Sequence, residues 1–150
     1  MIVSKTPFRI SFFGGGTDFP EWYNENDSLV ISTTIDKYCY IAARFLPPFF
    51  NTKYRVVYSE TELINDVEKI RHPVVKETIK YLNLSDKSLE LIHYADLPSR
   101  TGIGSSSSFT VGLLNSLTAL SNSYLDKKTL AEKAVHVERE LLDENVGCQD

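Results

Sequence analysis

The chain has 150 residues, 42% of them hydrophobic and 24% charged, with a formal net charge of −4. This acidic balance excludes the basic surface that nucleic acid or an anionic membrane would require, and no segment approaches the ~20 apolar residues that cross a bilayer. The N-terminus lacks the apolar segment of a signal peptide, and Cys39 and Cys148 have no metal-binding or disulfide spacing, so we expect a cytoplasmic protein with reduced thiols.

A β-rich run near the N-terminus, residues 6–13, leads into three consecutive glycines and an acidic residue. Strand alternation puts Arg9 on the more polar face of this run, opposite Phe8. The glycines at 14–16 permit a positive φ or the close approach of a ligand to the backbone. Taken alone, a glycine-rich turn followed by Asp18 is most often only a turn.

The middle of the chain is predicted to contain strands and a helical region. Segments rich in β-branched and aromatic residues predict strands, the first of them one long or two short, at residues 28–44, 54–58 and 88–94. Helical segments are expected over residues 60–82, with an interruption near Pro73. Trp22 and Tyr23 could form the wall of a ligand site, but core packing is the simpler interpretation. The scattered histidines are expected to be structural or surface residues: His72, His93 and His136.

Residues 98–108 are rich in glycine and serine and run into a helical pattern; we call them the Gly-Ser loop. Apolar residues recur three or four positions apart after it, at Phe109, Leu113, Leu117 and Leu120. A helix that begins within the serines would offer its first-turn N–H groups and its dipole to a phosphate, and Gly102 and Gly104 allow the tight turn. The serine hydroxyls add donors and can ligate a hard cation such as Mg²⁺. No lysine follows the last glycine, which excludes a P-loop, and a serine-capped helix explains the same residues without a ligand.

A second amphipathic helix is predicted near the C-terminus, with Asp126 as its N-cap. Its apolar face is broad and consists of Leu130, Ala131, Ala134, Val135, Val137, Leu141 and Leu142. Glu138 projects near the middle of this face, whereas Glu140 lies on the polar side with His136. His136 and Glu140 have the spacing of two metal ligands on a helix, but we interpret them as an incidental pair on a solvated face. Because burial of an unpaired carboxylate costs several kcal/mol, Glu138 is expected to meet a cation, a metal or strong donors, unless it lies at an edge and reaches water.

Three segments, in order, resemble those of the GHMP kinases, the superfamily of galactokinase, homoserine kinase, mevalonate kinase and phosphomevalonate kinase. The Gly-Ser loop is similar to the family's phosphate loop, with Ile103 in place of a leucine and Ser107 in place of an alanine. Residues 7–18 are similar to the sugar-side motif, but positions 15–16 are Gly-Gly where galactokinases carry Glu-His, which argues against galactose. Residues 146–150 are similar to the segment that carries the catalytic aspartate. The Gly-Gly-Gly-Thr-Asp form resembles the branch of D-glycero-D-manno-heptose 7-phosphate kinases and, more distantly, fucokinases.

The resemblance implies a role for each matching residue. Asp150 would orient or deprotonate the acceptor hydroxyl, and Arg9 would steady the developing charge nearby. Ser106 and Glu138 would ligate Mg²⁺, which gives Glu138 the partner that its position requires. The ATP phosphates would be held by Pro98, Gly102, Ile103, Gly104, Ser105, Ser106, Ser107 and Ser108. The sugar would be held by Gly14, Gly15, Gly16, Thr17 and Asp18.

The implied fold is α+β, a mixed β-sheet packed against helices, as in the GHMP kinase N-terminal domain (ribosomal protein S5 domain 2-like). Residues 1–150 would form this ATP-binding domain, and because the family's second domain is absent from the chain, we expect an N-terminal fragment with little turnover alone.

The expected reaction is transfer of the γ-phosphoryl group of ATP to the anomeric hydroxyl of a sugar phosphate. D-glycero-D-manno-heptose 7-phosphate is the first candidate, and fucose or another sugar is the second. Unranked candidates for binding the 7-phosphate are Lys5, Arg44, Lys53 and Arg100. A non-catalytic nucleotide- or sugar-binding module is the alternative from another class, and the oligomeric state is not predicted.

Overall fold

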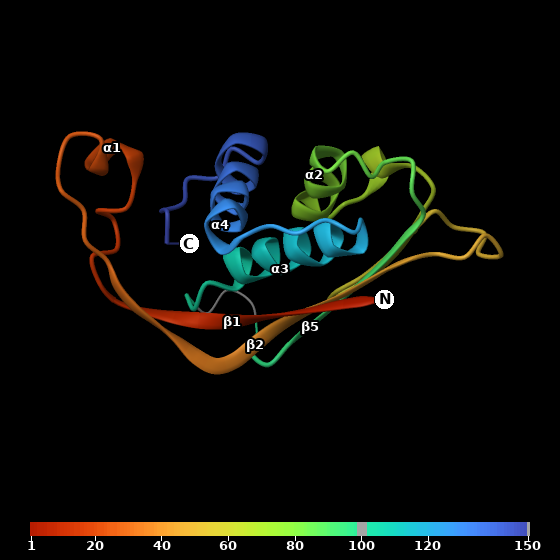
Figure 1. The fold of residues 1–150 in the computed structure, drawn as a ribbon, viewed down its shortest axis with the longest axis horizontal. Helices are drawn as coiled ribbons and strands as arrows, with labels where there is room; N and C mark the ends of the chain where they lie inside the picture. The colour runs from red at the N-terminus through yellow and green to blue at the C-terminus, as the bar shows by residue number, and fades with distance from the viewer. Residues whose placement is uncertain (99–101, 150) are drawn as a thin grey trace.

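The computed structural model describes residues 1–98 and 102–149, which fold around one five-stranded sheet (Figure 1). The strands are β1 (Ile2–Phe13), β2 (Ile31–Phe45), β3 (Tyr54–Val57), β4 (Thr61–Ile64) and β5 (Leu89–Ala95). Their order across the sheet is β1-β2-β5-β3-β4. The pair β3 and β5 is parallel, and the pairs β1 with β2, β2 with β5 and β3 with β4 are antiparallel. The sheet is therefore mixed, as the sequence predicts.

The main helices lie on one face of this sheet (Figure 1). They are α2 (Pro73–Tyr81), α3 (Ser105–Leu120) and α4 (Lys127–His136), and α4 continues directly into the π-helix η2 (Val137–Leu141). The short helix α1 (Pro20–Tyr23) lies in the connection between β1 and β2, and the 3₁₀ helix η1 (Val67–Lys69) precedes α2. In the part of the chain that the structure describes, no helix is long and apolar enough to cross a membrane.

The core lies between the sheet and α3. Alternate residues of β2 are buried on the helix side, namely Cys39, Ile41 and Ala43. From α3, Leu113 and Leu117 are completely buried, and burial of each leucine contributes about 1.5–3 kcal/mol. The helix approaches β1 closely at Gly112, where an added Cβ would lie 3.0 Å from Thr6 Oγ1. This close contact holds the middle of α3 over the first two strands.

The helical prediction for residues 60–82 is only partly right. Thr61–Ile64 is the edge strand β4, which pairs antiparallel with β3. Its Glu62 is buried, and the carboxylate accepts hydrogen bonds from the Tyr58 hydroxyl (2.9 Å) and the Arg71 amide (2.8 Å). These partners are not visible in local periodicity. Pro73 begins α2 at its first position rather than interrupting a helix, in agreement with the preference of proline for that position.

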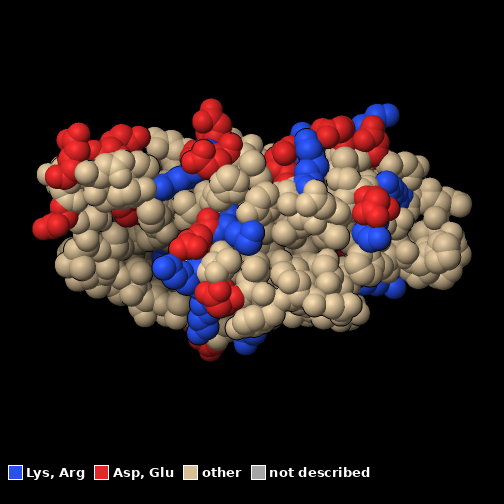
Figure 2. Space-filling model, turned by 45° about the horizontal axis from the view of Figure 1, so that its top comes forward, with Lys and Arg blue, Asp and Glu red and all other residues tan. Residues whose placement is uncertain are grey.

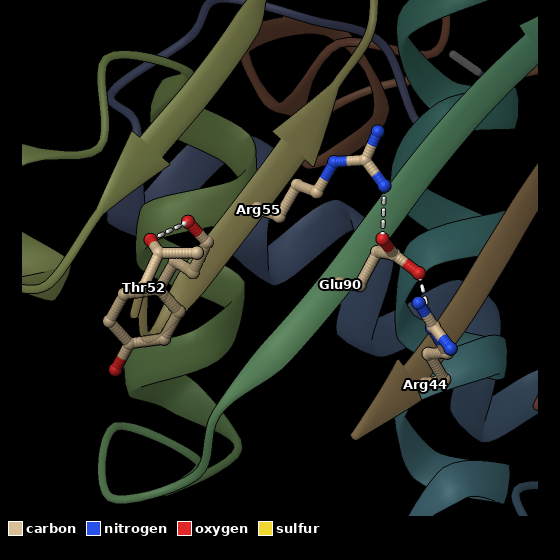
Figure 3. Close-up of polar contacts among 5 residues, drawn as sticks. Arg44, Thr52, Arg55 and Glu90 are labelled. Carbon is tan, nitrogen blue, oxygen red and sulfur yellow. Dashed lines mark hydrogen bonds and ion pairs between the residues drawn. The ribbon is translucent and has the colours of Figure 1, made fainter. Parts of the chain in front are cut away.

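An ion cluster joins three strands on the sheet face that the helices do not cover. Glu90 of β5 pairs with Arg44 of β2 and Arg55 of β3, as Figure 3 shows. The hydrogen bonds that Arg44 and Arg55 donate hold the pKa of the Glu90 carboxyl below its ordinary value, although burial of the carboxyl acts to raise that pKa. The Arg44 side chain is therefore engaged in an ion pair within the sheet.

Candidate functional site

The described part of the Gly-Ser loop turns into α3 through two glycines in the left-handed region. Gly102 and Gly104 both have a φ of 73°, which glycine adopts without a steric penalty. Helix α3 begins at Ser105, inside the serine run as predicted. Its N-cap is Gly104, which has no side chain to accept a first-turn N–H group. The start of α3 thus leaves backbone donors for an anionic ligand.

The four serine hydroxyls divide into bonded and unbonded groups. Three donate within the protein, Ser106 to Glu138 Oε1 (3.2 Å), Ser107 to the Gly104 carbonyl (3.1 Å) and Ser108 to the Pro7 carbonyl (3.2 Å). The Ser105 hydroxyl is buried and has no hydrogen-bond partner among the described residues. Ser108 is buried and ties α3 to β1, so its hydroxyl is structural, whereas Ser105 retains an unused donor.

A cavity of about 830 Å³ opens beside the start of α3. Most of the predicted phosphate-binding residues line it: Pro98, Gly102, Gly104, Ser105, Ser106 and Ser107. Ile103 and Ser108 do not; Ile103 packs against the core, and its carbonyl accepts the Arg9 amide (3.2 Å). The volume is within the range of small-molecule sites in proteins.

One wall of the cavity is aromatic and comes from segments that are distant in sequence. His72 stacks on Phe109 with ring centroids 4.7 Å apart, and His93 meets the same Phe109 edge-on at 5.1 Å. Tyr58 packs edge-on against His72 at 4.9 Å. Burial lowers the pKa of both histidines, which favours the neutral imidazole. The sequence assigns His72 and His93 no role at a site, but both line the cavity.

Glu138 is buried at the cavity, with only 1% of its surface exposed. Its Oε1 accepts hydrogen bonds from Thr110 Oγ1 (2.8 Å) and Ser106 Oγ (3.2 Å), both on α3. The residue lies in η2, and π-helical segments are frequent at functional sites. The prediction that Glu138 is buried and meets strong donors is confirmed, and the alternative of an edge position that reaches water is wrong. Thr110 was not singled out from the sequence, although it lies one helical turn after Ser106.

The residues at this point fit a magnesium ion. A carboxylate and a hydroxyl supply the hard oxygen ligands that Mg²⁺ prefers, and Mg²⁺ keeps several water or phosphate ligands of its own. In residues 1–98 and 102–149, no group of three or more His, Cys, Asp or Glu could hold a metal. Ser106 and Glu138 bring one hydroxyl and one carboxylate together at this point.

The turn at residues 14–18 requires glycine at position 14. Gly14 has a φ of 92°, and a Cβ there would lie 2.0 Å from the Leu29 carbonyl oxygen. The Thr17 hydroxyl donates to the Gly14 carbonyl (2.8 Å) and closes the turn. Asp18 is 5% exposed, and its carboxylate accepts hydrogen bonds from the amides of Gly16 (2.9 Å) and Gln149 (3.3 Å). The five residues predicted to hold the sugar lie together, but outside the lining of the 830 Å³ cavity.

Arg9 lies between the Gly-Ser loop and the chain that leads to Asp150. Its Nε donates to the Gln149 carbonyl (3.1 Å), and a Cβ at Gly104 would lie 3.1 Å from its Nη1. The guanidinium therefore lies beside the start of α3, where a phosphate would bind. Asp150 itself, predicted as the catalytic carboxylate, lies outside the described residues, as does Arg100.

Arg139 is a further cation near this region and was missed in the sequence. It donates to the carbonyls of Val146 and Asp18 and to the Tyr23 hydroxyl. Trp22 is 47% exposed and Tyr23 37%, so the expectation of core packing is wrong for both. The position of Arg139 next to Glu138 in the sequence could have drawn attention to it. Two of its three acceptors are backbone carbonyls, however, and the residue pattern of a sequence does not reveal such acceptors.

The other cations considered for a sugar phosphate are engaged elsewhere. Lys5 lies over the Tyr38 ring, with Nζ 3.7 Å from its centroid, and Arg44 pairs with Glu90. Lys53 lies 5.6 Å from the centroid of the Tyr54 ring. None of these three lines the cavity.

The surface charge is mixed. On the face in Figure 2, acidic side chains are numerous over the α1 segment and the helices, with lysines and arginines interspersed among them. The residues drawn on this face form no continuous basic surface.

Comparison with protein families matches residues 70–150, more than half of the chain, to the GHMP kinases N terminal domain. The chain belongs to the GHMP kinase family. A curated relative, the D-glycero-alpha-D-manno-heptose 7-phosphate kinase of Campylobacter jejuni, is 29% identical over 159 residues, which cover 99% of this chain and 46% of the relative. The present chain thus spans about half the length of that relative.

Solved structures share the fold. A D-glycero-D-manno-heptose 1-phosphate kinase from Bacteroides thetaiotaomicron matches 100% of this chain with 52% of its own, at a TM-score of 0.86 and 22% identity. Phosphomevalonate kinase from Streptococcus pneumoniae, in complex with phosphomevalonate and AMPPNP, matches 100% of this chain with 46% of its own, at a TM-score of 0.76 and 21% identity. The predicted family and the predicted α+β fold are confirmed.

Proposed function

We propose that this chain is the N-terminal, nucleotide-binding part of an ATP-dependent sugar kinase, and that the acceptor is D-glycero-D-manno-heptose 7-phosphate. The observation that carries the proposal is the buried Glu138 carboxylate, hydrogen-bonded to Ser106 at the first turn of α3 and facing a large cavity. A buried carboxylate next to free backbone donors suits Mg²⁺ and phosphate together. The similarity to a heptose 7-phosphate kinase supports the choice of acceptor.

ATP would bind with its phosphates at the start of α3 and its base toward the aromatic wall. Gly102, Gly104 and the following serines would donate backbone N–H groups to the β- and γ-phosphates. Ser105 Oγ, buried without a partner among the described residues, would gain a phosphate oxygen as acceptor. The apolar faces of His72 and Phe109 line the same cavity and suit a planar base.

Transfer would depend on two residues beside the phosphates. Asp150 would orient the anomeric hydroxyl of the acceptor, or accept its proton as the bond to phosphorus forms. Arg9, whose Nε holds the Gln149 carbonyl next to Asp150, would stabilise charge on the transferred phosphoryl group. Mg²⁺, held by Ser106 and Glu138, would supply charge neutralisation at the β- and γ-phosphates.

The sugar would bind on the side of residues 14–18. The turn brings backbone groups and the Asp18 carboxylate to one place, next to residues 147–149. Arg9 donates to the carbonyl of Gln149, whose amide in turn donates to Asp18, and Arg9 is therefore a candidate for the phosphate of a sugar phosphate. A fucokinase-like enzyme would use the same turn for an unphosphorylated sugar.

The test is sugar-dependent ADP formation by the longest natural form of the protein that contains these 150 residues. We expect turnover with D-glycero-D-manno-heptose 7-phosphate, weaker turnover with fucose, and loss of turnover in Asp150→Asn. Turnover with fucose alone would support the fucokinase-like alternative. ATP binding without turnover on any sugar would support the non-catalytic binding module and contradict the proposal.

A further inference from the structure

Arg139 joins three parts of the chain that are far apart in sequence. Its Nε donates to the Val146 carbonyl (2.8 Å), its Nη1 to the Tyr23 hydroxyl (3.1 Å) and its Nη2 to the Asp18 carbonyl (3.3 Å). One side chain therefore holds helix α1, the turn at residues 14–18 and residue 146 in fixed relation. The planar guanidinium allows this, because its donors diverge in a fixed geometry that an ammonium group lacks.

The segment 146–149 depends on such contacts, because it belongs to no helix or strand. Asp18 holds it from the other side: its carbonyl accepts the Cys148 amide (3.0 Å) and its carboxylate accepts the Gln149 amide (3.3 Å). Gly147 packs so closely that an added Cβ would lie 1.8 Å from Asp18 Oδ2. Every residue of the segment is thus in contact with Asp18 or Arg139.

Neighbouring residues of the π-helix η2 face different sites. Glu138 points to Ser106 and Thr110 on α3, while Arg139 points to Val146 and the turn at 14–18. Successive residues of a helix project roughly 100° apart, so the two side chains diverge. One turn therefore carries both the candidate metal ligand and the side chain that fixes the segment leading to Asp150.

We propose that Arg139 is a positioning residue: together with Asp18 it fixes the backbone of residues 146–149, the segment that leads directly to Asp150. This inference rests on the proposed kinase function. Arg139 acts through the Val146 carbonyl and the turn at 14–18. Phosphoryl transfer depends mainly on alignment, so a misplacement of about 1 Å costs about 100-fold in rate.

The experiment compares Arg139→Met, Arg139→Lys and the control Lys128→Met in the longest natural form of the protein. Methionine keeps the length of the side chain but removes the donors. Lys128 is a matched control because it lies on the preceding helix α4 and its side chain is 85% exposed. The measurements are kcat, the KM values for ATP and acceptor, and hydrogen exchange at the Cys148 and Gln149 amides.

We expect Arg139→Met to lower kcat by about 100-fold, with a change in the KM for ATP of less than about threefold, because the Gly-Ser loop is untouched. Exchange at Cys148 and Gln149 should accelerate. Arg139→Lys, which keeps the charge, should lose about tenfold in kcat, and Lys128→Met should match the wild type.

Two results would overturn the inference: an unchanged kcat in Arg139→Met, or a reduced kcat while both amides exchange as slowly as in the wild type. If the wild type shows no sugar-dependent turnover, the proposed function fails, and the exchange measurement alone then decides whether Arg139 holds residues 146–149. If Arg139→Met does not fold, Arg139→Lys gives the same comparison.

Discussion

Replacement of Glu138 by glutamine separates function from stability in this protein. The substitution keeps the size of the side chain and an acceptor for the Ser106 and Thr110 hydroxyls. It removes the negative charge that would attract Mg²⁺. We expect the variant to be at least as stable as the wild type in the absence of metal, and to lose the increase in ATP affinity that Mg²⁺ provides.

The magnitude follows from the burial of Glu138 and its two bonds to α3. A hydrogen bond to a charged group contributes about 1.5–3 kcal/mol and one to a neutral group about 0.5–1.5 kcal/mol, so two bonds weaken by about 2–3 kcal/mol in total. Burial of the charge costs several kcal/mol, which glutamine avoids. The net change should lie between zero and about 2 kcal/mol of stabilisation, or up to about 8 °C in Tm.

The assay is thermal unfolding in EDTA, followed by calorimetric titration of ATP with and without Mg²⁺. For the wild type, Mg²⁺ should tighten ATP binding by about tenfold or more, and for Glu138→Gln by less than about twofold. An equal effect of Mg²⁺ on both proteins would refute the assignment of Glu138 as a metal ligand. A loss of more than about 2 kcal/mol of stability without metal would show instead that the carboxylate is a structural anchor.

Three further outcomes are expected. Gly14→Ala should lose more than about 2 kcal/mol of stability, and Gly16→Ala only about 1 kcal/mol. Both residues have a positive φ, but only a Cβ at Gly14 would meet backbone, at 2.0 Å. Similar losses for the two variants in denaturant unfolding would contradict this. The free energy of unfolding should fall as the pH is lowered from about 7.5 to about 5.5, because burial lowers the pKa of His72 and His93 and the unfolded chain then binds more protons than the folded one. In a variant with both His72→Gln and His93→Gln, the free energy of unfolding should depend less steeply on pH. An unchanged pH dependence in that variant would show that the two histidines are not its origin. Asp18→Asn should reduce sugar use far more than ATP affinity, and an equal loss of both would argue against a role on the sugar side.

Local signals in the sequence predict the parts of the site that depend on a single element. The serine run predicts a helix that begins within it, and α3 begins at Ser105; the capping Asp126 predicts the start of α4. Helical periodicity alone predicts the burial of Glu138, although η2 is a π-helix, because the distortion begins only one residue before it. These features are set by neighbours within a few residues.

Contacts between distant segments could not be predicted in this way. Edge strand β4 has a buried Glu62 whose donors come from Tyr58 and Arg71, so its strand state depends on tertiary partners. The aromatic wall of the cavity forms because β5 and the start of α2 bring His93 and His72 to Phe109 on α3. Arg139 donates to backbone carbonyls, which every residue type carries, so the identity of its acceptor residues could not have predicted these hydrogen bonds.

The central claim is that the site transfers the γ-phosphoryl group of ATP to a sugar phosphate. The most direct measurement is ³¹P NMR of the products formed from ATP and D-glycero-D-manno-heptose 7-phosphate by the longest natural form of the protein. The account predicts a new phosphate ester at the anomeric carbon beside the retained 7-phosphate, formed with ADP in equal amounts and absent with Asp150→Asn. An ester at another hydroxyl, or unchanged ATP and sugar phosphate, would contradict it.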